Sequence, residues 1–221
     1  IAISHFHTDH SADFVTLLKT GNFTERTRPL GVSGPAGGGP FPSLTDFLTS
    51  NVGKDGAYQY LSGYIDGTGG LVRLEPVELD PSGDVVQAVR FMTDRDITIT
   101  ATGVPHGIVP AIAYRVRVGD TEIVFASDQN GNDERFIDFA KDVDVLVMHL
   151  VAPEGIEGSF RALHAPPGRI GEIASAAGAG KLVLSHLTRW SLPGLDENLA
   201  AVRNHYDGDI VLAEDLMCVS P

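Results

Sequence analysis

The sequence predicts an α/β fold, in which sheets carry helices on their outer sides. Two observations support this prediction. In the middle of the chain, β-branched residues gather in five short runs separated by turn residues, as is typical of consecutive strands. Strand and helix patterns then alternate up to the C-terminus. The chain length fits one globular domain over residues 1–221.

The first third of the chain mixes strand, helix and loop patterns. Ile1–Ser4 alternates in polarity and predicts a buried strand entered midway, and Ser11–Lys19 has apolar residues at helical spacing. The density of Gly and Pro in Pro29–Pro42 predicts a loop with at most a short strand. Ser43–Ser50 predicts a short helix. Asn51–Gly70 combines tyrosines with glycines, and we expect it to form a mobile aromatic lid.

The middle of the chain predicts strands in the runs Leu71–Leu79, Val85–Met92, Ile97–Thr102, Ala111–Val118 and Glu122–Ala126. The alternating part that follows predicts helices near Asp133–Ala140, over Pro167–Ala177 and around Leu195, Leu199 and Val202, and strands at Val143–His149, Lys181–Ser185 and Ile210–Ala213. Pro167 suits the first turn of its helix. The pattern therefore predicts sheets with helices outside them.

The composition is that of an ordinary soluble protein, with 43% hydrophobic and 20% charged residues. Acidic side chains outnumber basic ones by 29 to 16, and the formal net charge is −13. Such an average surface repels a phosphate polymer, so we expect that nucleic acid is not a partner. No apolar run of membrane-spanning length and no leader is visible, so we expect no membrane contact and a cytoplasmic location, unless an N-terminal signal has been lost. The sequence leaves a homo-oligomer open.

Four metal-ligand side chains lie within six residues after the first predicted strand: His5, His7, Asp9 and His10. Alternating positions of an extended segment point the same way, so His5 and His7 can face one point while Asp9 and His10 reach a second. Imidazole and carboxylate groups are the ligands that zinc takes in proteins. Packing these groups beside apolar strands without a cation would be costly. The motif therefore predicts a metal site.

Three further polar residues follow predicted strands. His106 lies in Gly-Val-Pro-His-Gly, Asp128 follows Ile-Val-Phe-Ala-Ser, and His186 follows Leu-Val-Leu-Ser. Strand ends are where α/β architectures collect their sites. By contrast, a single histidine such as His149 or His205 is more often an ordinary core or surface residue.

At these residues the sequence resembles the metallo-β-lactamase superfamily of di-zinc hydrolases, whose first motif matches His5-Phe-His7-Thr-Asp9-His10. The resemblance implies a four-layer αβ/βα sandwich and hydrolysis by a zinc-bound hydroxide. In that family further strands precede the first motif, so we expect that the first strands are missing here. The resemblance also implies two Zn²⁺ ions, with Mn²⁺ or Fe²⁺ as possible replacements. By the same resemblance, one ion is bound by His5, His7 and His106 and the other by Asp9, His10 and His186, with Asp128 between them.

Two stretches, Leu163-His164-Ala165 and Leu184 to Trp190, resemble motifs of one branch of the superfamily. This branch includes ribonuclease Z, arylsulfatases and phosphodiesterases. This resemblance implies that His164 assists the leaving group and that Asp9 accepts a proton from water. Arg189 and Trp190 either meet an anionic or aromatic substrate or have a local structural role.

The chain departs from ribonuclease Z in two places. Leu150 stands where that enzyme has Glu, and the 22 positions that separate His106 from Asp128 leave no room for a tRNA-clamping arm. We therefore expect a small anionic ester, either a phosphodiester or a sulfate ester, as the substrate. The alternatives are ribonuclease Z itself, a lactonase or β-lactamase that shares every ligand, and a metal-binding module without turnover.

Overall fold

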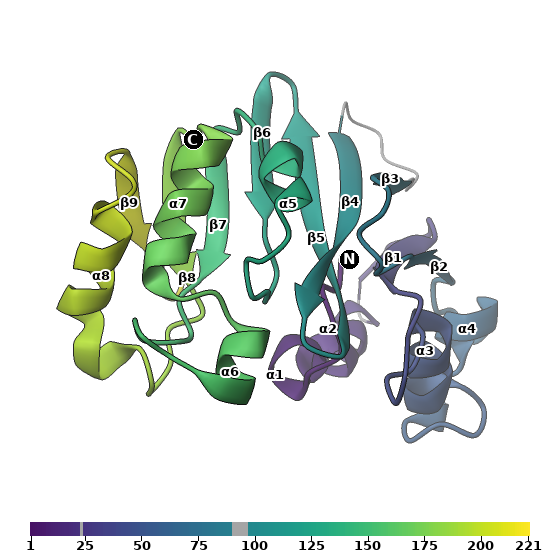
Figure 1. Cartoon of the computed structure of the whole chain (residues 1–221). Helices are drawn as coiled ribbons and strands as arrows, with labels where there is room; N and C mark the ends of the chain where they lie inside the picture. Colours follow the sequence, from purple (N-terminus) through teal and green to yellow (C-terminus); the bar gives the residue numbers. More distant parts are fainter. Residues whose placement is uncertain (23, 90–96) are drawn as a thin grey trace.

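The computed structural model describes residues 1–22, 24–89 and 97–221. The larger of its two sheets has seven strands of mixed direction (Figure 1). Its strands run in the order β3-β4-β5-β6-β7-β8-β9, antiparallel as far as β6 and parallel from there on. The strands are β3 (Gln87–Val89), β4 (Ile97–His106), β5 (Val109–Val118), β6 (Thr121–Phe125), β7 (Val145–His149), β8 (Lys181–Ser185) and β9 (Asp209–Leu212).

Helices cover one face of this sheet because each parallel connection needs a crossover (Figure 1). They are α5 (Arg135–Phe139), α6 (Gly158–Leu163), α7 (Pro167–Ala177) and α8 (Leu195–Arg203), and a 3-10 turn, Leu192–Gly194, precedes α8. The predicted apolar stripe of α7, which includes Ile170 and Ile173, is buried in the core between this layer and the sheet. Pro167 opens the helix, and Gly178 ends it in the left-handed conformation that favours glycine.

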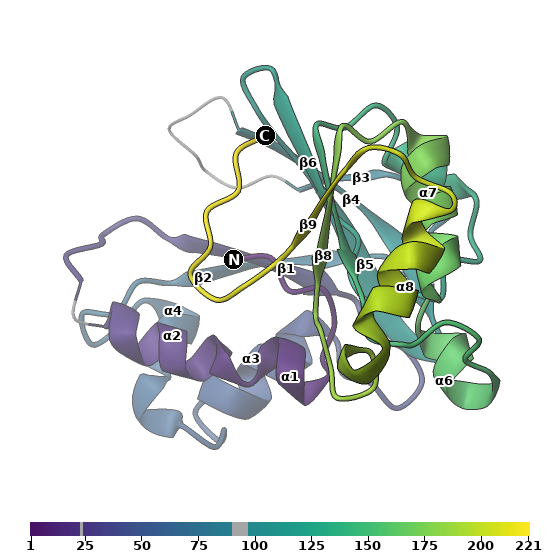
Figure 2. The same cartoon turned by 90° about the vertical axis from the view of Figure 1, so that its left-hand side faces the viewer.

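The opposite face of the large sheet meets a second, smaller layer (Figure 2). Two parallel strands, β1 (Leu30–Pro35) and β2 (Leu74–Leu79), form this layer together with the extended segment Ile1–Ile3. The Ile3 N–H donates to the Ser33 carbonyl at 2.8 Å, and the Ser33 N–H donates to the Ile1 carbonyl at 2.9 Å. The outer helices are α1 (Thr8–Ser11), α2 (Asp13–Gly21), α3 (Leu44–Val52) and α4 (Gly63–Asp66), with a 3-10 turn at Gln59–Leu61.

Helices and sheets therefore form four layers in the order α, β, β, α, which confirms the predicted α/β sandwich (Figure 2). The hydroxyl of Tyr114 joins the two sheets near the site described below. It lies on β5, accepts a hydrogen bond from the Ser33 hydroxyl at 3.2 Å and donates to the Ile3 carbonyl at 3.0 Å. Both sheets are thus held in register where Ile1–Ile3 leads into the histidine motif.

Several predicted boundaries differ from the structure. β4 continues to His106 and β5 starts at Val109, because the chain reverses in a tight hairpin at Gly107, whose φ is +60°. Helix α6 has no counterpart in the prediction, and only Ala2 of the expected Ile1–Ser4 strand forms a β-bridge. The strand predicted over Val85–Met92 covers only Gln87–Val89 here, and its last three residues lie outside the described part of the chain.

The segment predicted to be a mobile aromatic lid, Asn51–Gly70, lies partly in the core, although Tyr58 and Tyr60 are exposed. Tyr64 is buried, and its hydroxyl donates to the Leu18 carbonyl at 2.6 Å. Leu61 and Tyr64 join Leu18 and Leu44 in the apolar cluster beneath the outer helices. Their spacing of three residues puts both on one face, so the tyrosine contributes to packing and not to a surface over the site. Among the described residues, no helix is long and apolar enough to cross a membrane.

Candidate metal centre

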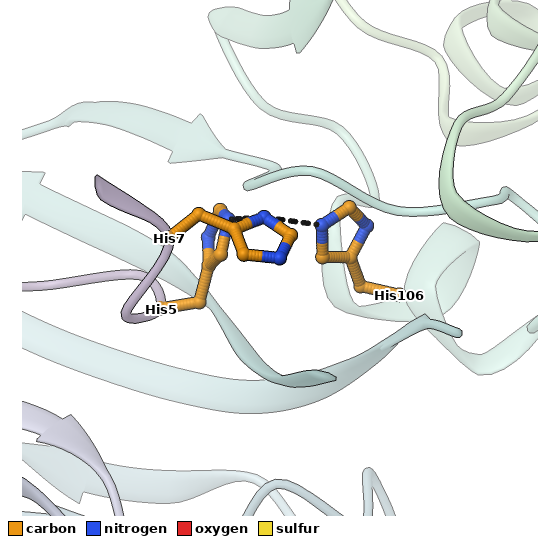
Figure 3. Close-up of side chains that lie close together, drawn as sticks. All are labelled: His5, His7 and His106. Carbon is orange, nitrogen blue, oxygen red and sulfur yellow. Dashed lines mark hydrogen bonds between the residues drawn. The ribbon is translucent and has the colours of Figure 1, made fainter. Parts of the chain in front are cut away.

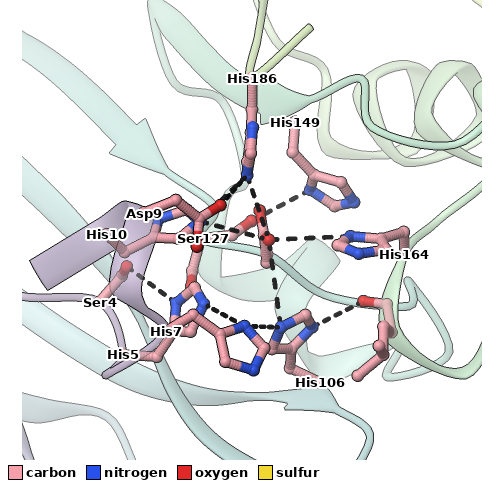
Figure 4. A network of polar contacts seen from close by, with 12 residues as sticks. Ser4, His5, His7, Asp9, His10, His106, Ser127, His149, His164 and His186 are labelled. Carbon is pink, nitrogen blue, oxygen red and sulfur yellow. Dashed lines mark hydrogen bonds and ion pairs between the residues drawn. The ribbon is translucent and has the colours of Figure 1, made fainter. Parts of the chain in front are cut away.

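Seven predicted site residues meet at one end of the two sheets, although they come from distant parts of the chain (Figure 4). His5 and His7 follow the Ile1–Ile3 segment, and Asp9 and His10 lie in α1. The large sheet supplies the rest: His106 ends β4, Asp128 follows β6, and His186 follows β8.

The first group of ligands consists of His5, His7 and His106 (Figure 3). Nδ1 of His7 lies 3.2 Å from Nε2 of His5 and 3.3 Å from Nε2 of His106. On the far side of its ring, Nδ1 of His106 donates to the Leu163 carbonyl at 2.8 Å. A carbonyl only accepts, so this bond fixes the proton on Nδ1 and leaves the Nε2 lone pair facing the group.

The second group consists of Asp9, His10 and His186. The Nε2 atoms of the two histidines are 3.0 Å apart. Oδ2 of Asp9 lies 3.6 Å from the first and 3.5 Å from the second. The Asp9 side chain is 64% exposed, so this group opens to solvent while the first is largely closed.

The carboxylate of Asp128 lies between the two groups. Its Oδ2 is 3.5 Å from Nε2 of both His10 and His186 and 4.0 Å from Nε2 of His106. The same oxygen is 3.7 Å from Nδ1 of His164. One buried oxygen thus faces four imidazoles, and Asp128 is the common member of the cluster.

Two left-handed residues set the directions of these side chains. Ser127, directly before Asp128, has φ 62°, and His186 has φ 55°. Residues other than glycine adopt this conformation at a cost, and such strain concentrates at functional sites. At the ends of β6 and β8 it turns the chain so that Asp128 and His186 point into the cluster.

The sequence favours an ordinary core or surface role for His149, whereas in the structure its ring bonds to the backbone on two sides of the site. Its Nδ1 donates to the Ser127 carbonyl at 3.1 Å, and its Nε2 accepts the Ala165 N–H at 3.2 Å. His149 therefore holds the backbone next to Asp128 and the backbone next to His164. The sequence signal was its place at the end of the strand between those that lead to Asp128 and His186.

Burial determines the protonation of the inner side chains. It lowers the pKa of His5 to about 2 and that of His164 to about 4, and it also lowers the pKa of His106. Burial alone would raise the pKa of Asp128, but hydrogen bonds from His10 and His186 hold it below its usual range. At neutral pH these three imidazoles are neutral and Asp128 is ionised, which are the forms that bind metal.

The donor set fits divalent metal ions. Where two imidazole nitrogens face each other at 3.0–3.3 Å, only one of them can donate, and buried lone pairs without a partner are costly. Nδ1 of His164 is also buried without a hydrogen-bond partner. The ligand atoms of each three-residue group lie within 4.8 Å of one another. Imidazole and carboxylate ligands suit zinc and similar transition metals, so the side chains as placed can hold such ions.

Residues 1–187 match the family model described as the beta-lactamase superfamily domain, and the chain belongs to this family. It is 26% identical over 246 residues to a ribonuclease Z of Methanosarcina acetivorans, covering 98% of this chain and 79% of that protein. It is 27% identical to a ribonuclease Z of Mycolicibacterium gilvum, with 98% and 75% covered.

Solved structures show the same fold. The short form of human tRNase Z superposes with a TM-score of 0.70 at 19% identity, over 100% of this chain and 78% of that one. The Bacillus subtilis metallo-β-lactamase fold protein YhfI superposes with a TM-score of 0.68 at 21% identity, over 96% and 74%. These superpositions confirm the predicted fold, and the family match over residues 1–187 confirms the predicted superfamily.

These relatives contradict the expectation that nucleic acid is not a partner. Proteins named ribonuclease Z align with nearly the whole chain, and their name implies a nucleic-acid substrate, so the net charge of −13 does not exclude such a partner. The inference was wrong because net charge is a sum over the whole surface. The potential at a site depends on local groups, and bound metal ions are the largest of these.

Replacing the shared carboxylate should empty the site. We expect Asp128→Ala to lose at least one metal equivalent per chain, because its Oδ2 faces ligands of both groups, and to lose nearly all turnover. Elemental analysis of the purified protein gives the metal content. Asp138→Ala, an exposed aspartate on α5, is the matched control and should keep the wild-type content. Full metal content at normal rate in Asp128→Ala would contradict the assignment.

Acid should destabilise the metal-free protein through His149. Burial lowers the pKa of His149 from 6.5 to about 4, so the folded state keeps it neutral while the unfolded chain takes up a proton. The corresponding stability is present above pH about 6.5 and is lost as pH falls to about 4, up to about 3 kcal/mol. Urea denaturation across this range measures it. His149→Gln should make this dependence shallower without removing it, because burial also lowers the pKa of His5, His106 and His164. The exposed His205→Gln should leave the dependence unchanged, so equal slopes in all three proteins would refute the assignment.

Proposed function

We propose that this chain is a metal-dependent phosphodiesterase that holds two divalent ions, with Zn²⁺ as the first candidate and Mn²⁺ or Fe²⁺ as replacements. The observation that carries the proposal is the position of Asp128 Oδ2 between two groups of ligands. The proposed ligands are His5, His7 and His106 for one ion, Asp9, His10 and His186 for the other, and Asp128 for both. When bound, such ions neutralise charge on a phosphoryl group and make water acidic enough to attack near neutral pH.

Asp9 is the proposed proton acceptor. Its carboxylate is the most exposed member of the cluster, and its Oδ2 is within 3.6 Å of His10 and His186. A base must reach both solvent and the reacting centre to take a proton from the attacking water and release it. Asp128, which is buried beneath it, has no such access.

His164 is the proposed donor to the substrate. It follows α6, is buried, and its Nδ1 points toward Asp128 without a hydrogen-bond partner. An imidazole nitrogen placed there can donate a hydrogen bond to the phosphoryl or leaving oxygen. The bonds from His149 to Ser127 and Ala165 keep Asp128 and His164 at a fixed spacing, so His149 is a positioning residue.

We place an RNA phosphodiester first among substrates, because ribonuclease Z relatives align with nearly the whole chain. Sulfate esters, lactones and β-lactams remain the other outcomes of the test, since the same ligands serve any of these reactions.

The test is hydrolysis of bis(p-nitrophenyl) phosphate and of a tRNA precursor with a 3′ trailer by zinc-loaded protein. We expect turnover that a chelator abolishes and that added metal restores. Cleavage of the precursor would identify RNA as a substrate, and turnover of only the small diester would restrict the proposal to phosphodiesters. Failure on both, with turnover of a β-lactam, lactone or sulfate ester, would overturn it.

Removing the His164 imidazole should affect rate and not metal content. We expect His164→Ala to bind metal normally and to hydrolyse bis(p-nitrophenyl) phosphate about 10²–10⁴-fold more slowly, the usual range for lost proton-transfer assistance. Steady-state rates together with metal analysis of the same sample measure this. A wild-type rate would assign His164 to packing alone, and lost metal would make it a ligand.

A further inference from the structure

A row of aromatic rings leads from the centre of the site to the surface. The ring of Phe160 on α6 lies 4.8 Å from the ring of His164, and the ring of Trp190 lies 6.2 Å from that of Phe160 in an edge-to-face arrangement. The guanidinium of Arg189 lies over the indole at 4.9 Å. His164 in turn faces Asp128, so the row begins at the proposed reacting centre.

The outer rings of this row do not serve the core. Trp190 is 56% exposed and Phe160 is half-buried, and neither belongs to a hydrophobic cluster formed by the described residues. An exposed indole adds little to folding free energy, because most of its surface stays in water. Exposed aromatic side chains of this kind do, however, bind nucleobases by stacking.

The backbone that carries Trp190 is held rigidly. The Thr188 hydroxyl donates to the Val151 carbonyl at 2.9 Å and accepts the Trp190 N–H at 3.1 Å. The Thr188 N–H donates to the Ser191 hydroxyl at 3.1 Å, and the Asn198 side-chain amide donates to the Ser191 carbonyl at 3.0 Å. Both Ser191 and Asn198 are buried. An exposed side chain on a fixed backbone loses little entropy when it binds a ligand.

Arg189 adds a positive charge to this surface. It is exposed, and within the part of the chain that the structure describes no carboxylate pairs with it. The nearby Arg161, by contrast, is bonded to the Asn130 carbonyl and the Asn132 side chain. In a chain of net charge −13, a cation stacked on an aromatic ring beside the site favours a ligand that is both aromatic and anionic.

We propose that Phe160, Arg189 and Trp190 form a nucleotide-binding ledge, in which the indole stacks on a nucleobase, the Phe160 ring contacts the edge of the base, and the guanidinium contacts its phosphate. This inference rests on the proposed function, because it supplies the recognition of one nucleotide next to the phosphodiester that is cleaved. The ledge accepts any of the bases, since every base has a face that can stack.

The fluorescence of Trp190 tests the ledge directly, because it is the only tryptophan of the chain. We expect adenosine 5′-monophosphate to quench the emission of zinc-loaded protein in a saturable way. Ribose 5-phosphate, which carries the same phosphate without a base, should quench weakly or not at all. Equal quenching by both ligands would show that the signal reports phosphate at the metal site, and would overturn the proposal.

Variants that keep the reporter locate the contact. Phe160→Ala should weaken adenosine 5′-monophosphate binding about 5-fold or more, the lower end of the range for loss of one aromatic contact to a base. Arg189→Gln should weaken the binding of adenosine 5′-monophosphate more than the binding of adenosine, which has no phosphate. The control Tyr60→Ala removes an exposed ring from the outer helices and should leave the affinity unchanged. A folded Phe160→Ala variant with wild-type affinity would refute the ledge.

Kinetics on thymidine 5′-(p-nitrophenyl phosphate) separate this proposal from the proposed function. Trp190→Ala should raise KM about tenfold with a small effect on kcat, and Trp190→Phe should restore most of the loss. Quenching without turnover of any phosphodiester would refute the phosphodiesterase and leave the ledge. Turnover of bis(p-nitrophenyl) phosphate without selective quenching would refute the ledge alone.

Discussion

The carboxylate of Asp128 is the group on which the site depends. It is buried and ionised, and one oxygen faces imidazoles from α1, the end of β4, the segment after α6 and the end of β8. A buried negative charge requires compensation, and the surrounding nitrogens with the ions they can bind provide it. The segments that carry these imidazoles must therefore converge on Asp128, at one end of the two sheets.

The scaffold holds this charge with rigid, partly strained backbone. Ser127 and His186 keep left-handed conformations, and the His149 ring ties the turn at Ser127 to the segment that carries His164. On the other side, the Tyr114 hydroxyl fixes the segment before His5 to the large sheet. Strained turns of this kind cost free energy locally, whereas satisfied buried hydrogen bonds rigidify the backbone, and together they give the site its fixed geometry. The Trp190 loop follows the same principle at the surface, since its hydroxyl bonds orient an exposed ring.

Sequence patterns predicted best those elements whose burial follows a simple period. The stripe of α7 and the apolar run of β8 gave bounds that agree with the structure. Helix α6 was missed because none of its residues is buried, so it has no apolar stripe. The tyrosines of Asn51–Gly70 suggested a lid, because composition does not show which ring enters a core. The net charge likewise gave a wrong expectation about nucleic acid, since it contains no information on where charges lie.

The sequence by itself determined the α/β class, the candidate metal ligands of the His5–His10 motif and the family to which the chain belongs. These follow from local order, because residues a few positions apart on one short segment must share one place. The family resemblance implied that Asp128 lies between two ligand groups. Only the tertiary structure showed that His149 bonds the backbone beside both Asp128 and His164, and that the rings of Phe160 and Trp190 lie in a row leading from His164. Those relations join residues separated by tens to more than a hundred positions, and packing of the sheets and helices brings them together.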